Sequence, residues 1–310
     1  MAWIKSCIIF TTVIKSVIIR IGRQRTFTGG RDWIHRLLDF RTLDYFAGLH
    51  DNNLKLIVNG PVTGTVANLK SPELSVTSGS GRTDILLGFR LSGLPEIESS
   101  IINAKIVKAS TYMADLSEIL DEFSPGSTHA SLRKIARGEE LTFKGSIDGF
   151  YEDLVAFGEL TTHTMGKAKL DILCRQETES YSITGHILTD MLDLGRILPS
   201  ESLGVLTCDA GLSASFGRKN SVSIDSLSIS RFGLLGYDYS NLKADGLLTS
   251  NDFKGSVTAR DPNLDLDFDG LVTFKLKDDK EDGEYDRFKF NLSLNNANFD
   301  ELNLEERDSK

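Results

Sequence analysis

Residues 264–276 (LDLDFDGLVTFKL) decide the fold of this chain. In this stretch apolar residues or glycine occupy every second position, and Asp265, Asp267, Asp269 and Thr273 lie among the residues between them. A period of two residues is that of a β-strand with one buried face and one solvated face. Residues 167–172 and 288–294 show the same alternation. The pattern therefore predicts an all-β protein from residue 54 onward.

Glycine recurs at one position within these segments. Seven segments have the order apolar-x-Gly-x-apolar, centred on Gly64, Gly145, Gly158, Gly185, Gly246, Gly255 and Gly270. In each segment the alternation puts the glycine on the apolar side, where it weakens a strand unless a bend, a bulge or a close approach requires it. Glycine kinks also let sheets curve strongly. We therefore predict an elongated, strongly curved antiparallel sheet that forms a groove with an apolar interior.

A few short amphipathic helices are expected beside the sheet. Residues 33–47 begin after a capping Asp32 and end before Gly48, which is typical of a helix. The octets at 113–120 and 191–198 both have the order M-x-D-L-x-x-I-L, and each follows an alternating segment. Such a unit used twice favours a modular, elongated architecture. We predict helices near 33–47, 113–122 and 191–198.

The chain divides by composition into three parts. Residues 1–30 form a basic segment, residues 31–50 contain the first predicted helix, and residues 54–310 form one continuous, repetitive β-rich body. Residues 1–41 carry eight Lys and Arg against two Asp, although the whole chain has a net charge of −9. Lys5, Lys15 and Arg20 interrupt the apolar run at the start. Two interpretations stay open: a poor membrane anchor or a solvated, non-native segment.

The charge and the cysteines exclude some classes of protein. A net charge of −9 argues against nucleic-acid binding, which needs clustered cations. The three cysteines, Cys7, Cys174 and Cys208, give an odd count without metal-type spacing, so no disulfide framework is expected. A bridge between Cys174 and Cys208 stays open beside two isolated thiols.

No motif in the sequence predicts an enzyme, a cofactor or a metal. Asp265-x-Asp267-x-Asp269-Gly270 copies the start of an EF-hand loop, but the twelfth position, which needs a glutamate, is Leu276. In a strand the three aspartates would lie together on the outer face. The five histidines are scattered, and no nucleophile or phosphate-loop motif accompanies them. We expect neither catalysis nor a bound cofactor.

The order of several short blocks resembles a known family. These are VNGPVTGTVANL (58–69), ITGHILTDMLDLGRIL (183–198), GYDYSN (236–241), DPNL (261–264) and FDELNL (299–304). Together they resemble the TamB/AsmA-type translocation and assembly module family, in the form found in Bacteroides-like bacteria. The resemblance runs from about residue 54 to the C-terminus and does not include the first 30 residues.

The resemblance implies a function in the envelope of a Gram-negative bacterium. Members are anchored in the inner membrane, and their periplasmic β-rich body is pictured as an apolar groove. They are linked to phospholipid transport between membranes and to outer-membrane protein assembly and secretion. The resemblance thus implies phospholipid acyl chains and an outer-membrane assembly protein of the Omp85 type as partners.

We expect twelve apolar side chains to line such a groove: Phe143, Ile147, Ile183, Ile187, Phe253, Val257, Leu266, Phe268, Val272, Phe274, Phe288 and Phe290. The alternative is a compact β-sandwich binding module, such as an adhesin or a glycan binder, in which the same side chains pack between two sheets. Glycan sites usually expose aromatic rings, and both tryptophans, Trp3 and Trp33, lie outside the β-rich region. That distribution favours the groove.

Overall fold

The computed structural model describes residues 32–39, 55–65, 67–93, 96, 99–112, 115, 138–176, 180–197, 200–217, 220–249, 251–273 and 288–304. The chain divides into two compact units, Met1–Thr164 (unit 1) and Met165–Lys310 (unit 2). Within the described residues both units are built from antiparallel strands, so the predicted all-β class is confirmed. The predicted curvature and the single continuous body over 54–310 stay predictions.

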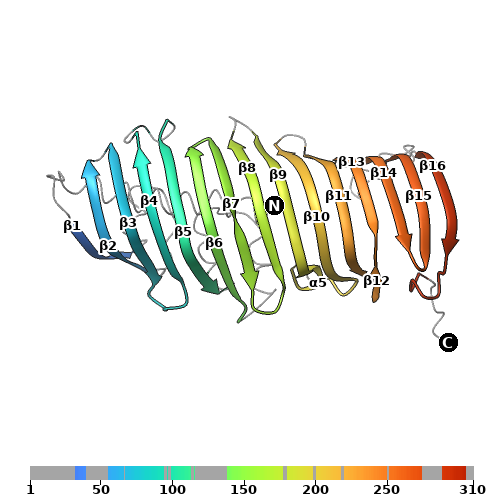
Figure 1. Cartoon of the computed structure of the whole chain (residues 1–310), viewed down its shortest axis with the longest axis horizontal. Helices are drawn as coiled ribbons and strands as arrows, with labels where there is room; N and C mark the ends of the chain where they lie inside the picture. The colour runs from blue at the N-terminus through green and yellow to red at the C-terminus, as the bar shows by residue number, and fades with distance from the viewer. Residues whose placement is uncertain are drawn as a thin grey trace, which may run out of the picture. The chain divides into compact units, whose positions relative to one another are not determined.

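Unit 1 is a sheet in which the strands follow their order in the chain (Figure 1). The strands are β1 (Asp32–Asp39), β2 (Lys55–Thr65), β3 (Asn68–Ser78), β4 (Asp84–Ser92), β5 (Ile101–Tyr112), β6 (Glu140–Phe150) and β7 (Asp153–Thr162). Each strand from β2 to β6 pairs with the strand before it and the strand after it.

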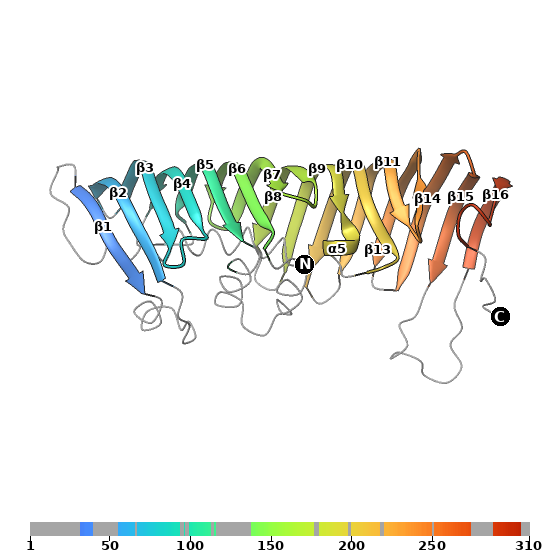
Figure 2. The same cartoon turned by 90° about the horizontal axis from the view of Figure 1, so that it is seen from below.

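Within unit 2 the strands also pair with their neighbours in the chain, apart from one short strand (Figure 2). Its elements are β8 (Lys167–Gln176), β9 (Tyr181–Asp193), α5 (Leu194–Ile197), β10 (Leu203–Phe216), β11 (Ser221–Leu234), β12 (Tyr237–Tyr239), β13 (Leu242–Thr249), β14 (Asp252–Asp261), β15 (Leu264–Thr273) and β16 (Phe288–Ala297). The short β12 pairs only with the end of β11, and β13 pairs with the rest of that strand.

The two-residue period predicted from the sequence is visible in the burial of unit 1. Along β5, Ile102, Ala104 and Ile106 are buried, and the residues between them are exposed. Ala104 pairs with Phe89 on β4 and with Ile147 on β6, and all three side chains are buried. The core of unit 1 is therefore one face of its sheet.

The predicted helix over 33–47 is wrong where the structure describes it. Residues 32–39 form β1, which pairs along its whole length with Lys55–Val62 of β2. This pairing supplies hydrogen-bond partners for the backbone groups along one edge of β2. Such tertiary pairing outweighs the local helical preference of a short segment. Residues 40–47 of this prediction lie outside the described residues.

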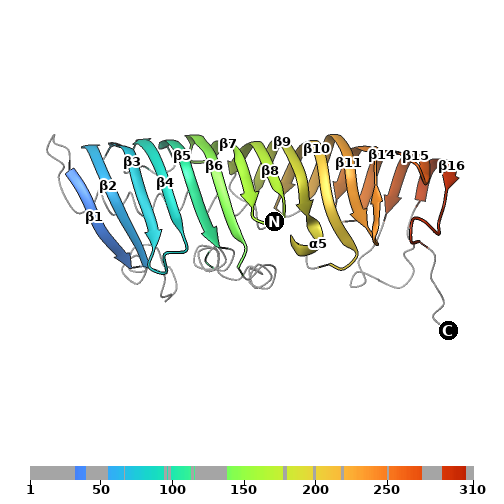
Figure 3. The same ribbon diagram turned by 60° about the horizontal axis from the view of Figure 1, so that its bottom comes forward.

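The predicted helix over 191–198 is partly right. The strand β9 runs through Asp193, and α5 covers only Leu194–Ile197 (Figure 3). The carboxylate of Asp193 accepts a hydrogen bond from the Arg196 backbone N–H at 3.0 Å, so Asp193 is the N-cap and fixes where the helix begins. The predicted helix over 113–122 lies outside the described residues apart from Asp115.

The two described cysteines are half-buried thiols that form no disulfide with each other, Cys174 on β8 and Cys208 on β10. Burial raises the pKa of the Cys208 thiol, and the hydrogen bond with Thr189 offsets part of that rise. Of the two interpretations that the sequence left open, separate thiols are therefore confirmed over the Cys174–Cys208 bridge.

A buried carboxylate holds the turn between β12 and β13 against the β14–β15 turn. Asp261 accepts hydrogen bonds from the Tyr237 hydroxyl, from the Ser240 backbone N–H and hydroxyl, and from the Asn263 backbone N–H. Burial alone would raise the pKa of Asp261, but these hydrogen bonds stabilise the ionised form, and the net effect lowers its pKa. The ionised carboxylate is thus a structural tie.

Replacing this carboxylate (Asp261→Asn) is expected to destabilise unit 2 by about 2 kcal/mol at pH 7, because hydrogen bonds to a charged acceptor are lost. A lowered folded-state pKa means that the ionised form contributes stability above the ordinary carboxyl pKa of 3.8 and loses it as pH falls through the folded-state value. The difference between wild type and variant in urea denaturation should therefore shrink at acid pH. Asp238→Asn, which alters an exposed ion pair with Arg231, should change stability little at either pH.

Candidate functional site

The cross-strand register of unit 2 brings most of the predicted groove residues onto one face of the sheet. One row crosses β9 to β16 through Ile183, Ala214, Val222, Leu248, Phe253, Val272 and Phe288. A second row crosses the same strands through Ile187, Ala210, Leu227, Ala244, Val257, Phe268 and Leu292. Because directly paired residues lie on the same side of a sheet, these rows form a continuous surface, the apolar face of unit 2.

Glycines separate the two rows. Gly246, Gly255 and Gly270 pair directly with one another across β13, β14 and β15. A Cβ at Gly270 would lie 2.4 Å from Phe290 on β16, and a Cβ at Gly255 would lie 2.1 Å from the Asp245 carbonyl oxygen. The glycine positions therefore allow close approach of neighbouring strands and leave a strip without side chains between the two apolar rows.

The strands at the end of unit 2 carry an aromatic cluster. The ring centroid of Phe268 lies 6.1 Å from that of Phe253 and 5.4 Å from that of Phe290, and Phe290 lies 6.5 Å from Phe288. Phe288 is 61% exposed and Phe290 is 45% exposed. Leu292 and Leu294 on the same strand are about as exposed. Such a contiguous apolar patch is unusual for a surface that stays in water and marks a binding site.

The opposite face of unit 2 is mostly polar, although Leu188, Leu247 and Leu271 also lie on it. Asp265, Asp267 and Asp269 on β15 point away from the apolar face, as the alternation predicts. Arg260 of β14 contacts Asp265 at 3.2 Å and Asp267 at 2.7 Å. The hydrogen bond to Asp267 raises the pKa of the Arg260 guanidinium. Two of the three aspartates therefore share one guanidinium, which offsets part of their negative charge.

Among the described residues, no group of three or more His, Cys, Asp and Glu side chains is arranged to hold a metal ion. We expect that EDTA leaves the thermal unfolding midpoint unchanged, because Arg260 contacts two of the three carboxylates at the site that most resembles a calcium loop. Differential scanning fluorimetry with EDTA and with added CaCl₂ measures this. A midpoint that falls with EDTA and recovers with calcium would contradict it.

The two groove residues predicted in unit 1 lie on the face that forms the core of that unit. Ile147 is buried, and Phe143 is half-buried on the same strand. The ring of Phe143 lies over Gly145 and Gly158, within 2.9 Å of where a Cβ would be on either glycine. In unit 1 an aromatic ring therefore fills the strip that the glycines leave, and within the described residues its apolar face is a packed core.

The structure thus brings Ile183, Ile187, Phe253, Val257, Leu266, Phe268, Val272, Phe288 and Phe290 together on unit 2. Phe143 and Ile147 lie on unit 1, and Phe274 lies outside the described residues. Leu292, Leu294, Leu248 and Leu227 also belong to the apolar face but were not among the predicted residues. Their alternation was available in the sequence, but only the register shows which of them adjoin the aromatic cluster.

Among the described residues, no helix has the length and apolar character needed to cross a bilayer. Comparison of the chain with protein-family models, with curated proteins and with solved structures finds no match. The resemblance to the TamB/AsmA-type family therefore stays a prediction made from the sequence.

Proposed function

We propose that unit 2 binds phospholipid acyl chains along its apolar face, as part of an apolar conduit in the envelope of a Gram-negative bacterium. The observation that carries this proposal is the exposure of Phe288, Phe290, Leu292 and Leu294, between 45% and 61%, on a face that is apolar across neighbouring strands. Covering an apolar surface of this kind with hydrocarbon removes it from water, which is favourable.

The arrangement of the face suits an acyl chain. The strip of Gly246, Gly255 and Gly270 runs across the strands between two rows of larger apolar side chains. A chain lying along the strip would contact apolar atoms on both sides without requiring a polar partner. Each buried methylene contributes about 0.8 kcal/mol, so a chain that buries eight of them gains about 6 kcal/mol.

The alternative of a compact β-sandwich requires two sheets packed face to face at about 10 Å. Within each unit the described strands form a single sheet and contact mainly their neighbours in that sheet. The exposed aromatic cluster of unit 2 also lacks a described element packed over it. These features support the conduit over a sandwich module for adhesion or glycan binding.

The wider role follows from the family resemblance. We propose that the protein moves phospholipid between membranes or assists outer-membrane protein assembly and secretion, with a partner of the Omp85 type. The proposal includes neither enzymatic activity nor a cofactor.

The experiment that tests binding is extraction of the purified protein with organic solvent, followed by mass spectrometry of the extract. We expect phospholipid in a reproducible molar ratio to protein. After delipidation, the protein should take up a fluorescent phospholipid from solution. A protein that emerges without lipid and takes up none after delipidation would contradict the proposal.

A further inference from the structure

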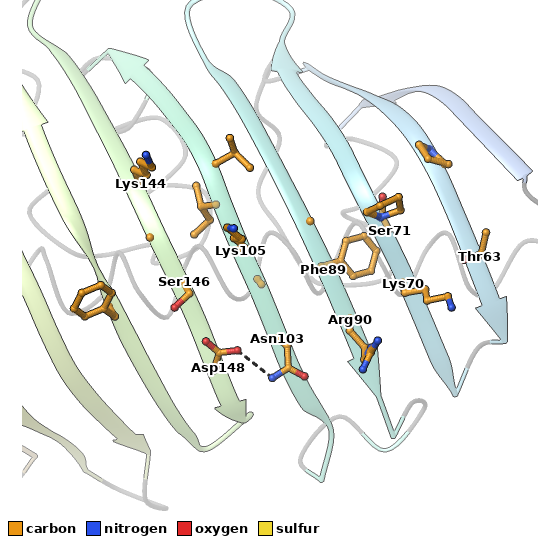
Figure 4. Close-up of a pocket in the computed structure, with 18 residues that line it drawn as sticks. Thr63, Lys70, Ser71, Phe89, Arg90, Asn103, Lys105, Lys144, Ser146 and Asp148 are labelled. Atoms are coloured by element: carbon orange, nitrogen blue, oxygen red, sulfur yellow. Dashed lines mark hydrogen bonds between the residues drawn. The ribbon is translucent and has the colours of Figure 1, made fainter.

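A second candidate binding surface lies on unit 1, on the face of the sheet opposite its apolar core. An open depression of about 1310 Å³ lies over β2 to β7. Its lining includes the cations Lys70, Arg90, Lys105 and Lys144, and Asp148 is its one carboxylate. Figure 4 shows these side chains on neighbouring strands of the sheet.

Two of the four cations are placed directly opposite each other. Lys70 on β3 pairs with Arg90 on β4, and like charges at paired positions repel. Lys105 on β5 pairs with Gly88, two residues from Arg90, and so lies diagonally across from Arg90. All three side chains are exposed, and within the described part of the chain none of them forms an ion pair.

The acidic groups near this cluster have partners of their own. The Asp148 carboxylate accepts a hydrogen bond from the Asn103 amide at 3.0 Å (Figure 4), and Lys144 pairs across the strands with Glu159. The Asn103 amide orients the Asp148 carboxylate but does not cancel its charge. The lining keeps a net positive charge because its four cations outnumber its one carboxylate. A compact anion within the triad of Lys70, Arg90 and Lys105 would relieve their repulsion.

A glycine lies in the floor of the depression. Gly88 on β4 pairs with Lys105 on β5 and lies two residues from Arg90. The neighbouring backbone packs closely against Gly88, because a Cβ there would be 2.8 Å from the carbonyl oxygen of Pro72, which lies in a register shift of β3. The floor beside the triad is therefore backbone without a side chain, and the charge of the depression comes from the cations around it.

Exposed apolar side chains border the triad. Phe157 on β7 lines the depression and is 61% exposed, and Val155, Phe150 and Ile101 are exposed on the same face of β5 to β7. Cations beside exposed aromatic and aliphatic side chains are typical of a surface that contacts lipid headgroups and inserts apolar groups between them. An acidic peptide would spread its carboxylates along a chain, whereas a phosphate concentrates its charge at one point.

We propose that the triad of Lys70, Arg90 and Lys105 binds the phosphate groups of an anionic lipid surface, with Phe157 inserted beside them. The planar guanidinium of Arg90 suits two phosphate oxygens at once. This site lies on the opposite face of the sheet from the core of unit 1 and is independent of acyl-chain binding by unit 2. Failure of either proposal leaves the other untouched.

The test is sedimentation of the full chain with vesicles of phosphatidylcholine alone or with phosphatidylglycerol added. We expect binding only to the anionic vesicles, weakened by salt because the charges are exposed. The triple variant K70Q/R90Q/K105Q should lose affinity by about a hundredfold. The matched variant K243Q/K254Q/K289Q removes the same charge from the polar face of unit 2 and should retain affinity. Circular dichroism and thermal unfolding check that both variants stay folded.

Two further measurements distinguish a lipid headgroup from a free phosphate as the bound group. Phe157→Ser should weaken vesicle binding several-fold and leave the fold intact, because its side chain is exposed. Inorganic pyrophosphate, measured by calorimetry, should bind weakly. Tight pyrophosphate binding without vesicle binding, equal binding to both kinds of vesicle, or equal losses in both triple variants would each overturn the proposal.

Discussion

Replacing Phe268 with aspartate (Phe268→Asp) is expected to leave unit 2 folded and to remove the phospholipid that co-purifies with the protein. Phe268 is half-buried in the middle of the aromatic cluster, with Phe253 and Phe290 on either side. A carboxylate at this position would stand among acyl chains without a partner, and burying an unpaired charge costs more than the lipid contacts gain. Mass spectrometry of an organic extract measures the loss.

The fold should survive this substitution because the ring is only partly buried. Losing its packing and its aromatic contacts costs about 2–3 kcal/mol, which is less than the total stability of a typical domain. In the closed core of a sandwich the same change would cost several kcal/mol more and unfold the protein. A variant that cannot be purified, together with a wild type that carries no lipid, would favour the sandwich.

The matched control is Leu271→Asp. Leu271 lies on the polar face of the same strand and pairs with Lys254 on one side and Lys289 on the other. An introduced carboxylate would meet two lysines there, so the protein should fold and retain its lipid. Equal lipid loss in both variants would show that the effect does not depend on the face.

The second large effect is expected at the glycine strip. Gly246 has a φ of +143°, which L-residues rarely adopt, and a Cβ there would lie 2.4 Å from the Lys254 carbonyl oxygen. Gly246→Ala should therefore destabilise unit 2 by about 3 kcal/mol or more, since both the backbone and the β13–β14 pairing must shift. Urea denaturation followed by circular dichroism measures the change.

A second glycine, two strands away from β13, provides the control. At Gly211 on β10 the nearest atom to an added Cβ is the Ser226 hydroxyl oxygen at 3.2 Å, a side-chain atom that can rotate away. Gly211→Ala should change the free energy of unfolding by less than about 1 kcal/mol. If Gly246→Ala were as stable as Gly211→Ala, the close approach at the glycine strip would not be a structural requirement.

The sequence predicted the strands well because one physical signal dominates them. The alternation over 264–276 identified β15, and the glycines that it placed on the apolar side do lie there. The helix at 33–47 was predicted from a capping Asp32 and a terminal Gly48, both of which are local signals. Its pairing with β2 depends on a distant strand, which a local pattern does not contain.

The candidate sites differ in how far the sequence could identify them. Much of the apolar face follows from alternation, because along β13, β14, β15 and β16 its residues stand at every second position. On β11 a register shift between Ile224 and Leu227 changes the parity, which the alternation alone does not show. The cation triad of unit 1 could not be predicted, since Lys70, Arg90 and Lys105 are separated in sequence and meet only through the β3–β4 and β4–β5 registers. Two bulges shift those registers, and nothing in the sequence fixes where a bulge falls.

The central claim, that the apolar face of unit 2 contacts lipid, is tested most directly by site-specific photocrosslinking in cells labelled with radioactive phosphate. A photoreactive phenylalanine analogue would replace Phe290 on the apolar face or Lys289 beside it on the polar face. The account predicts labelled phospholipid on the protein when the analogue is at position 290 and none when it is at position 289. No label at position 290, or equal label at both positions, would contradict it.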